Sequence, residues 1–341
     1  MSLPKTYKQA AFHEAGGNLV ISQVELKEPA KDEILIKVEA CGVCHSDIQP
    51  QHNLWGAGFP LVPGHEVIGT VAAVGEGVTG WEHGQRIGAA WHGGMCSSCD
   101  NCKQGLYQFC APFHVNGVTR NGGYAEYVII RAQAAVHVPD GVDAAKFAPM
   151  LCAGSTVFNS IKAAKLSPGD TVAVQGLGGV GHMAVQFARK MGYRVIAVSR
   201  GPDKEQAARA MGAHEYVDSE AGDAGEAIQK LGSAKLVVTT ALDTKAIAPL
   251  LKGVGIYGRL LILSLPQPAV MELNTFELLT RGGTVQCFPV GNFLDVEETL
   301  RFADLQGLES VVETFPLDDA QKAFDHMLSG KARFRAVLTM V

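Results

Sequence analysis

The sequence has no apolar run long enough to cross a lipid bilayer. Its longest runs, LVVTTAL and RLLILSLP, are far shorter than the ~20 residues that a spanning helix needs. The first residues lack the apolar core and cleavage site of a secretory signal. Neither sign of charge dominates, since 29 Lys and Arg stand against 34 Asp and Glu. We therefore expect a cytoplasmic protein that acts on a small molecule and binds neither membrane nor nucleic acid.

Internal repeats and low-complexity tracts are also missing, and charged residues make up only 18% against 47% hydrophobic ones. This composition is typical of a well-packed globular protein. Because 341 residues exceed what one hydrophobic core usually serves, we expect more than one domain.

Short strand patterns separated by glycine and proline fill residues 1–154, which predicts a mostly β domain with long loops. They lie at 18–26, 33–40, 67–75, 124–130 and 135–139. In residues 155–290, strand patterns alternate with helix patterns, which predicts βαβ units on a doubly wound parallel sheet. The strands are expected at 171–175, 194–198, 215–218, 235–240 and 259–264, and helices at 181–192 and 202–213. Residues 291–341 show helix patterns at 295–307 and 317–330 and a strand pattern at 334–341.

Four of the eight cysteines lie in one loop, residues 93–110. Cys96, Cys99, Cys102 and Cys110 have the spacing C-x2-C-x2-C-x7-C. In a reducing compartment, clustered cysteines more often bind metal than form disulfides. This spacing predicts a structural zinc that supplies folding energy to a polar loop, with an iron–sulfur cluster as the alternative.

A glycine-rich turn follows the strand pattern at 171–175. Gly176, Gly178 and Gly181 form G-x-G-x-x-G, with Gly179 and Val180 inside the turn, where a helix pattern begins. The first glycine permits the tight turn, the second lets a pyrophosphate approach, and the third allows close helix–strand packing. The helix N-terminus offers unpaired N–H groups to the phosphates. The turn therefore predicts a dinucleotide site.

The end of the next strand pattern bears on which dinucleotide binds. An NAD site usually has an acidic residue about twenty positions after the glycines, where it binds the ribose 2′-OH. Here Ser199 is followed by Arg200, with Lys204 one turn later. A hydroxyl and two cations suit a 2′-phosphate, so we favour NADP over NAD. The alternative is that both cations are solvated surface charges.

A second group of candidate ligands is spread through the first domain. Cys41 and Cys44 lie in CGVCHSD, His65 and Glu66 in VPGHEVIG, and Cys152 in MLCAGST. A Cys–His–Cys set leaves a fourth coordination position open, as a catalytic zinc requires. Their wide separation does not establish that they meet, and ordinary packing is the alternative.

Taken together, CGVCHSD, PGHE, the four-cysteine loop, LCAG, GLGGVG and PVGN resemble the zinc-dependent medium-chain alcohol dehydrogenases. The resemblance runs from about residue 8 to the C-terminus and is strongest to the branch of yeast-type and cinnamyl alcohol dehydrogenases. It implies a GroES-like catalytic domain with an inserted Rossmann domain, and a C-terminal segment that returns to the catalytic domain. It also implies two Zn²⁺ per chain and a homodimer or homotetramer.

The resemblance assigns the catalytic zinc to Cys44, His65 and Cys152, and leaves Cys41 as a spare core thiol. It implies that Asp47 orients His65, a role that metal-bound histidines commonly require. Glu66, beside the metal, would enter its coordination during ligand exchange.

Proton transfer is implied to begin at Ser46, which would take the alcohol proton. Many relatives end this relay on a histidine three residues later, where this chain has Gln49. Because an amide does not titrate near neutral pH, the acceptor is left open between His52 and water.

The remaining positions concern cofactor and substrate. The resemblance implies that His45 and Arg335 contact the pyrophosphate and that the backbone of Val290 contacts the carboxamide. Trp55 and Trp91 match aromatic pocket positions, which favours a flat or apolar substituent on the substrate. Ordinary packing is the alternative for each of them.

The expected function is interconversion of primary alcohols and aldehydes, in which zinc lowers the pKa of the alcohol oxygen and NAD(P) carries the hydride. A polyol or secondary-alcohol dehydrogenase with a more polar pocket is the alternative among enzymes. A nucleotide-binding protein that keeps only the structural zinc is the alternative outside them.

Overall fold

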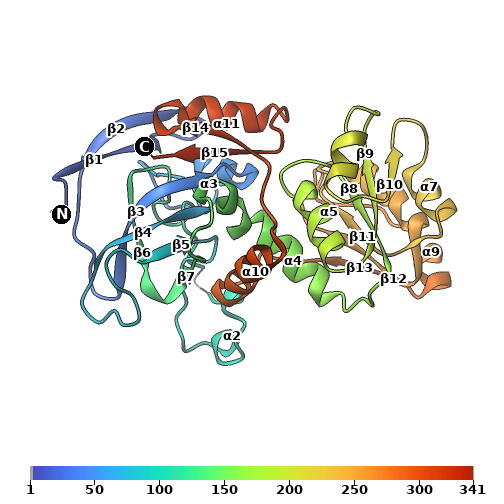
Figure 1. Cartoon of the computed structure of the whole chain (residues 1–341), viewed down its shortest axis with the longest axis horizontal. Coiled ribbons are helices and arrows are strands. Elements are labelled where there is room, and N and C mark those ends of the chain that lie inside the picture. The colour runs from blue at the N-terminus through green and yellow to red at the C-terminus, as the bar shows by residue number, and fades with distance from the viewer. Residues whose placement is uncertain (1–2, 112, 341) are drawn as a thin grey trace. The chain divides into compact units, whose positions relative to one another are not determined.

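The computed structural model describes residues 3–111 and 113–340, which form two compact units (Figure 1). The first comprises Met1–Ser155 and Val290–Val341, and the second Thr156–Pro289. The first is rich in strands, and the second alternates strands and helices. The predicted fold class, a mostly β domain with a parallel-sheet domain inserted into it, is confirmed.

A seven-stranded sheet forms the frame of the first unit, with the order β14-β15-β3-β4-β5-β7 and β6 paired to β3. Its strands are β3 (Glu33–Gly42), β4 (Val67–Val74), β5 (Arg86–Ala89), β6 (Tyr127–Arg131), β7 (Ala135–His137), β14 (Val312–Pro316) and β15 (Arg335–Thr339). β1 (Thr6–Phe12) and β2 (Leu19–Glu25) form an antiparallel ribbon that shares the core of this sheet. The period-2 pattern buries Ile34, Ile36 and Val38 of β3 in that core.

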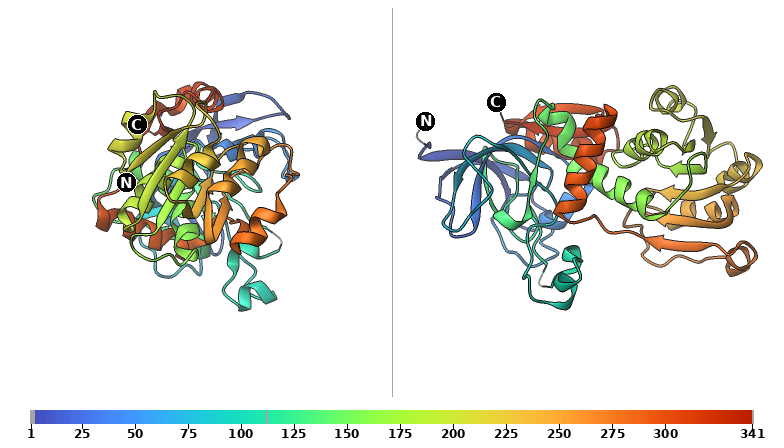
Figure 2. Two further views of the ribbon diagram at one scale, coloured as in Figure 1. Left: turned by 90° about the vertical axis from the view of Figure 1, so that its right-hand side faces the viewer. Right: turned by 60° about the horizontal axis from the view of Figure 1, so that its bottom comes forward.

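The C-terminal segment returns to this sheet, because β15 pairs with β3 in antiparallel register, Leu338 opposite Cys41. The expected strand at 334–341 is thus present, although Val341 lies outside the described residues. The α-helices of the first unit are α1 (Ile48–Gln51), α2 (Asp100–Lys103), α3 (Ala144–Phe147), α10 (Phe293–Gln306) and α11 (Ala320–Leu328). Its 3-10 helices are η1 (His45–Asp47), η2 (Tyr107–Phe109), η3 (Ala132–Ala134), η4 (Ala148–Leu151) and η6 (Leu317–Asp319). The loop that carries α2 extends away from the sheet (Figure 2).

A six-stranded parallel sheet with the order β10-β9-β8-β11-β12-β13 is the centre of the second unit. Its strands are β8 (Thr171–Gln175), β9 (Arg194–Ser199), β10 (Glu215–Asp218), β11 (Ala234–Thr239), β12 (Val254–Ile262) and β13 (Thr284–Cys287). Its helices are α5 (Gly181–Lys190), α6 (Glu205–Ala210), α7 (Ala224–Lys230), α8 (Thr244–Ile247), η5 (Ala248–Gly253) and α9 (Thr275–Arg281), and α4 (Ala153–Ala163) leads into it from the first unit. Continuous apolar strands such as β8 and β9 are buried because helices cover both faces of a parallel sheet.

Strand order reverses between β8 and β11, where the connections turn to opposite sides of the sheet. Ligands of such sheets bind at this switch point, beyond the carboxyl ends of the strands. Sequence patterns missed β1, β5, β13 and β14. Of these, β13 and β14 are partly exposed and lack a continuous apolar run, and β5 is only four residues long. Among the described residues, no helix is both long and apolar enough to cross a membrane.

Candidate active site and metal centres

Cys44, His65, Glu66 and Cys152 come together in the first unit, with one ligand atom of each within 4.8 Å of the others. Cys44 lies between β3 and η1, His65 just before β4, and Cys152 between η4 and α4. The sulfur atoms of Cys44 and Cys152 are 3.9 Å apart. Zinc–sulfur bonds of about 2.3 Å give a tetrahedral edge of about 3.8 Å, so this spacing fits a zinc ion.

The imidazole of His65 is fully buried, and neither of its ring nitrogens has a hydrogen-bond partner among the described residues. Its Nδ1 lies 3.2 Å from Oδ1 of Asp47. A buried nitrogen without a partner is costly, and a metal ion on Nε2 would satisfy it. Burial lowers the pKa of His65, but the charges of Asp47 and Cys44 outweigh burial and raise it to about 9.

The two thiols of this cluster titrate as a pair. A hydrogen bond from the Cys152 thiol lowers the pKa of Cys44 well below its usual value. The same bond, together with burial, raises the pKa of Cys152 well above it. The first proton therefore leaves readily, and the Cys44 thiolate is available as a metal ligand.

Asp47 is fully buried and links two of the candidate ligands. Its Oδ2 accepts the backbone N–H of Cys44 at 2.9 Å and the hydroxyl of Tyr124 at 2.8 Å, while its Oδ1 faces His65. Sequence reasoning did not single out Tyr124, because nothing near it in the sequence marks it as a site residue.

Glu66 and Arg335 form a buried ion pair, in which Nε donates to Oε2 at 3.2 Å and Nη2 donates to Oε1. Glu66 Oε1 lies 4.0 Å from His65 Nε2. The resemblance implies that Arg335 contacts the cofactor, but in the structure its side chain is buried and its guanidinium is engaged by Glu66. Contact with a pyrophosphate stays a prediction.

The loop after Cys44 carries the other predicted residues of this region. Ser46 is half-buried and His45 is exposed, both in η1. Gln49 Oε1 accepts the indole N–H of Trp55 at 2.6 Å. His52 is exposed, and its ring faces Gly16, whose missing side chain would meet the ring carbon Cε1 at 3.6 Å.

The two tryptophans have different surroundings. Trp91 packs edge-to-face on His65, with ring centroids 4.9 Å apart. Trp55 is 43% exposed and meets Phe113 edge-to-face at 5.8 Å. Trp91 therefore packs against the cluster of candidate ligands, whereas Trp55 and Phe113 form an exposed aromatic pair.

We call residues 93–110 the cysteine lobe. Its four cysteines also come together, with their sulfur atoms within 4.8 Å of one another. Cys96 and Cys102 sulfurs are 4.0 Å apart, again close to a tetrahedral edge. Hydrogen bonds from Ser98 and from the N–H of Cys99 lower the pKa of Cys96 to about 5, whereas burial raises that of Cys110 to about 12. All eight cysteines are free thiols.

The glycine-rich turn of the second unit joins β8 to α5. Gly176 has φ of +92°, and a side chain at Gly181 would lie 1.6 Å from the carbonyl oxygen of Gly176. A side chain at Gly178 would meet nothing within 4 Å. The first and third glycines are thus required by the fold, and the second leaves open space in which a phosphate would fit.

Ser199 is buried at the end of β9, Arg200 is exposed, and Lys204 Nζ lies 3.4 Å from the carbonyl oxygen of Leu177 in the glycine-rich turn. The structure adds Asp218, which the sequence prediction overlooked. Its Oδ1 accepts the N–H groups of Gly201 at 2.8 Å and Glu220 at 2.9 Å. A carboxylate is therefore present beside the end of β9, where Asp218 lies opposite Ser199, although two backbone donors already bind it. Val290 is half-buried between β13 and α10.

A thiolate–imidazole cluster in one unit and a glycine-rich turn on a parallel sheet in the other define the class of zinc-binding nicotinamide dehydrogenases. Residues 30–140 match the alcohol dehydrogenase GroES-like domain, and residues 179–304 match the zinc-binding dehydrogenase family. The chain belongs to the zinc-dependent medium-chain alcohol dehydrogenases and is an NAD(P)-dependent oxidoreductase.

Individual relatives agree with this assignment. Alcohol dehydrogenase notN of Aspergillus sp. (strain MF297-2) is 57% identical over 340 residues, covering 100% of both chains. The structure of a cinnamyl alcohol dehydrogenase from Sorghum bicolor is 30% identical with a TM-score of 0.88 and covers 98% of each chain. That of acetophenone reductase from Geotrichum candidum in complex with NAD is 30% identical with a TM-score of 0.84 and covers 99% of this chain and 98% of that one.

Proposed function

We propose that this alcohol dehydrogenase interconverts aromatic or apolar primary alcohols and their aldehydes, using a catalytic zinc held by Cys44, His65 and Cys152. The observation that carries the proposal is the buried cluster in which these donors meet, with a sulfur–sulfur distance of 3.9 Å and an unpartnered Nε2. A second zinc in the cysteine lobe makes two per chain. When bound at the first cluster, zinc supplies Lewis-acid polarisation of the substrate oxygen.

The chain's own residues orient the ligands and move the proton. The Asp47 carboxylate lies 3.2 Å from Nδ1 of His65 as its ion-pair partner, which would leave Nε2 for the metal. Ser46 accepts the proton of the substrate hydroxyl as it passes its own proton on. Gln49 is hydrogen-bonded to Trp55 and does not titrate near neutral pH, and the exposed ring of His52 lies beside Gly16, so we assign the proton's exit to water.

Glu66 is the one acidic member of the cluster, and Arg335 donates hydrogen bonds to both of its carboxylate oxygens. If Glu66 were to enter the coordination of a bound zinc, Arg335 would compete with the metal for its carboxylate oxygens. We propose that Arg335 thereby restrains Glu66 to transient coordination.

Aromatic side chains support the choice of substrate. Trp91 lies against the ring of His65, and Trp55 with Phe113 provides a further aromatic surface in the same unit. Flat substituents pack well on such surfaces. The relatives named as cinnamyl alcohol dehydrogenase and acetophenone reductase carry the names of aromatic compounds.

For the cofactor we propose a preference for NADP over NAD. Arg200 and Lys204 provide positive charge near the end of β9, and Lys204 reaches the glycine-rich turn. Asp218 opposes a 2′-phosphate, because the two backbone N–H groups on its Oδ1 favour its charged form, and the proposal requires that the two cations outweigh it. A 2′-phosphate would then be favoured over the bare ribose hydroxyl. We place His45 and Val290 at the pyrophosphate and the carboxamide by resemblance to the family.

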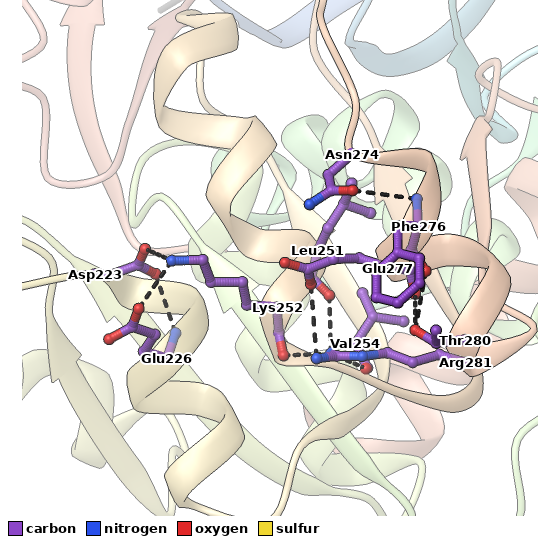
Figure 3. A network of polar contacts seen from close by, with 10 residues as sticks. All are labelled: Asp223, Glu226, Leu251, Lys252, Val254, Asn274, Phe276, Glu277, Thr280 and Arg281. Atoms are coloured by element: carbon purple, nitrogen blue, oxygen red, sulfur yellow. Dashed lines mark hydrogen bonds and ion pairs between the residues drawn. The ribbon is translucent and has the colours of Figure 1, made fainter.

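We further propose a homo-oligomer that assembles through the edge of the six-stranded sheet. β13 ends that sheet, and α9 beside it exposes Phe276 by 70% and Leu279 by 80%. Arg281 fixes α9 by donating to the carbonyls of Leu251, Lys252 and Val254 (Figure 3). A rigid apolar surface next to an open strand edge suits a two-fold interface with a second copy.

The cytoplasm, where free thiols persist, is the proposed compartment.

The deciding experiment compares kcat/KM for NADPH and NADH with cinnamaldehyde, acetophenone and a polyol on wild-type protein and on the Cys152→Ser variant. We expect the highest value with cinnamaldehyde and NADPH, and loss of about one zinc and nearly all activity in the variant. A preference for the polyol or the ketone would contradict the substrate class. Higher activity with NADH would contradict only the cofactor preference, and full activity in Cys152→Ser would overturn the site.

A further inference from the structure

We infer that Tyr124 is a positioning residue for the catalytic zinc site, acting on His65 and Cys44 through Asp47. The inference rests on the proposed zinc site and adds to it a residue that lies 77 positions from Asp47 in sequence. The hydroxyl of Tyr124 donates to Oδ2 of Asp47 at 2.8 Å. Tyr124 touches neither metal nor substrate in this arrangement, so its effect is indirect.

Tyr124 is fixed on both its backbone and its ring. Its N–H donates to the carbonyl of Pro63 at 3.1 Å, and its carbonyl accepts the N–H of Ala10 at 2.8 Å. Its ring is fully buried and lies against Gly64, which has φ of +102°; a side chain there would come within 2.5 Å of the ring carbon Cδ1. The glycine before His65 is therefore required to admit this ring. Because Pro63 and Gly64 directly precede His65, Tyr124 and the ligand share one rigid frame.

The hydroxyl has one evident role in that frame. A buried phenol needs a hydrogen-bond partner, and Asp47 provides it. Burial and the neighbouring Asp47 charge raise the pKa of Tyr124 well above its usual value, so the hydroxyl stays a donor. With Tyr124 and the N–H of Cys44 both on Oδ2, the carboxylate is turned so that Oδ1 faces Nδ1 of His65. One carboxylate thus positions two zinc ligands, and Tyr124 is the side chain that helps to fix its orientation.

Replacing Tyr124 by Phe removes only this hydroxyl and keeps the ring that packs on Gly64. Asp47 then keeps one donor on Oδ2, and its hold on His65 loosens. Loss of a group that orients a metal ligand costs about 10- to 100-fold in metal affinity, and we expect the lower end because Tyr124 acts through Asp47. The zinc site of the cysteine lobe contains none of these residues, so release of zinc from it serves as an internal standard.

The test measures zinc release to a colorimetric chelator in the wild type, Tyr124→Phe, Asp47→Asn and the double variant. We expect Tyr124→Phe to speed release of the catalytic zinc about tenfold and to leave release of the lobe zinc unchanged, whether or not the thermal midpoint falls with the lost buried hydrogen bond. In the Asp47→Asn background the Tyr124 change should have no further effect, since the two residues act in series. Tyr127→Phe is the matched control, because Tyr127 is half-buried in the same segment and packs on Tyr7 instead.

Other results of the zinc-release experiment would each contradict a particular part of the hypothesis. Release of the catalytic zinc at the wild-type rate in Tyr124→Phe would overturn the positioning role. Faster release of both zinc ions with a lower thermal midpoint would show that the hydroxyl only stabilises the core, which also overturns it. Additive effects with Asp47→Asn would show that Tyr124 does not act through Asp47. A wild-type protein whose zinc content is the same as that of Cys152→Ser would overturn the proposed site itself, and this inference with it.

Discussion

Arg335 and Glu66 form a bidentate ion pair inside the first unit, 269 positions apart in sequence, with the carboxylate fully buried beside His65. Arg335 is the first residue of β15, so this C-terminal strand places a positive charge beside the candidate ligands Glu66 and His65. Removing one member of a buried pair leaves the other charge without compensation, which is more costly than removing both.

The first prediction concerns this pair. Arg335→Met should lower the free energy of unfolding by about 3–5 kcal/mol, because Glu66 would remain charged and buried. The double variant Glu66→Gln/Arg335→Met should be less destabilised than the sum of its single variants. Urea unfolding measures both, with Arg301→Met, at an exposed arginine, as the control. Additive effects would show that the two side chains do not stabilise each other.

The second prediction concerns the cysteine lobe. Cys102→Ser should lower the zinc content by about one ion per chain and expose the lobe to trypsin at Lys103, whose side chain is already 67% exposed. The start of α10 should loosen too, because Asn292 donates to Gln108 at 3.1 Å and Phe293 stacks on Tyr107. Elemental analysis and limited proteolysis measure these changes. Cys287→Ser, outside both clusters, should leave the zinc content unaltered.

The third prediction concerns the aromatic pair of Trp55 and Phe113. Trp55→Leu should raise KM for cinnamaldehyde about tenfold, equivalent to about 1.4 kcal/mol of lost binding, with kcat changed little. Gln49→Ala should act in the same direction but less, because it frees the indole without removing it. Acetaldehyde, which is too small to use the aromatic surface, is the control substrate. An equal change in KM for both aldehydes would place Trp55 outside the substrate pocket.

The fourth prediction concerns pH. Burial lowers the pKa of His182 from 6.5 to about 4, so below pH 6.5 the unfolded chain binds a proton that the folded chain does not. The contribution of His182 to the free energy of unfolding is therefore at its maximum above pH 6.5. It falls by about 3 kcal/mol in total as the pH drops from 6.5 to 4. His182→Gln should show a shallower loss of unfolding free energy between pH 6.5 and 4.5 than the wild type. The exposed His13→Gln variant should keep the wild-type slope.

The fifth prediction concerns assembly. Leu279→Glu places a charge on the apolar surface of α9 and should shift the protein from oligomer to monomer in light scattering coupled to gel filtration. Leu305→Glu is the matched control, since Leu305 is a helix leucine exposed by 79% in the first unit. A monomeric wild type, or an unchanged mass in Leu279→Glu, would place the interface elsewhere.

Local sequence patterns predicted the features whose residues lie close together in the chain. The lobe cysteines span fifteen positions and the glycines of the turn six, so one loop or one turn brings each set together. The parallel sheet was predicted because buried strands alternate with helices along the chain. Short exposed strands such as β13 have no such signal.

Contacts between distant segments were decided only by the tertiary structure. The sequence, with the family resemblance, identified Asp47, Glu66 and Arg335 one by one. It did not show that the Tyr124 hydroxyl donates to Asp47 or that the Arg335 guanidinium donates to Glu66. These contacts depend on how β15, the segment before β6 and the start of β4 pack together. Gln49 with Trp55 and Asp218 with Gly201 were likewise invisible in sequence, since their partners follow from loop geometry. Residue types state which bonds a side chain can make, and the pairing of strands decides which of them it makes.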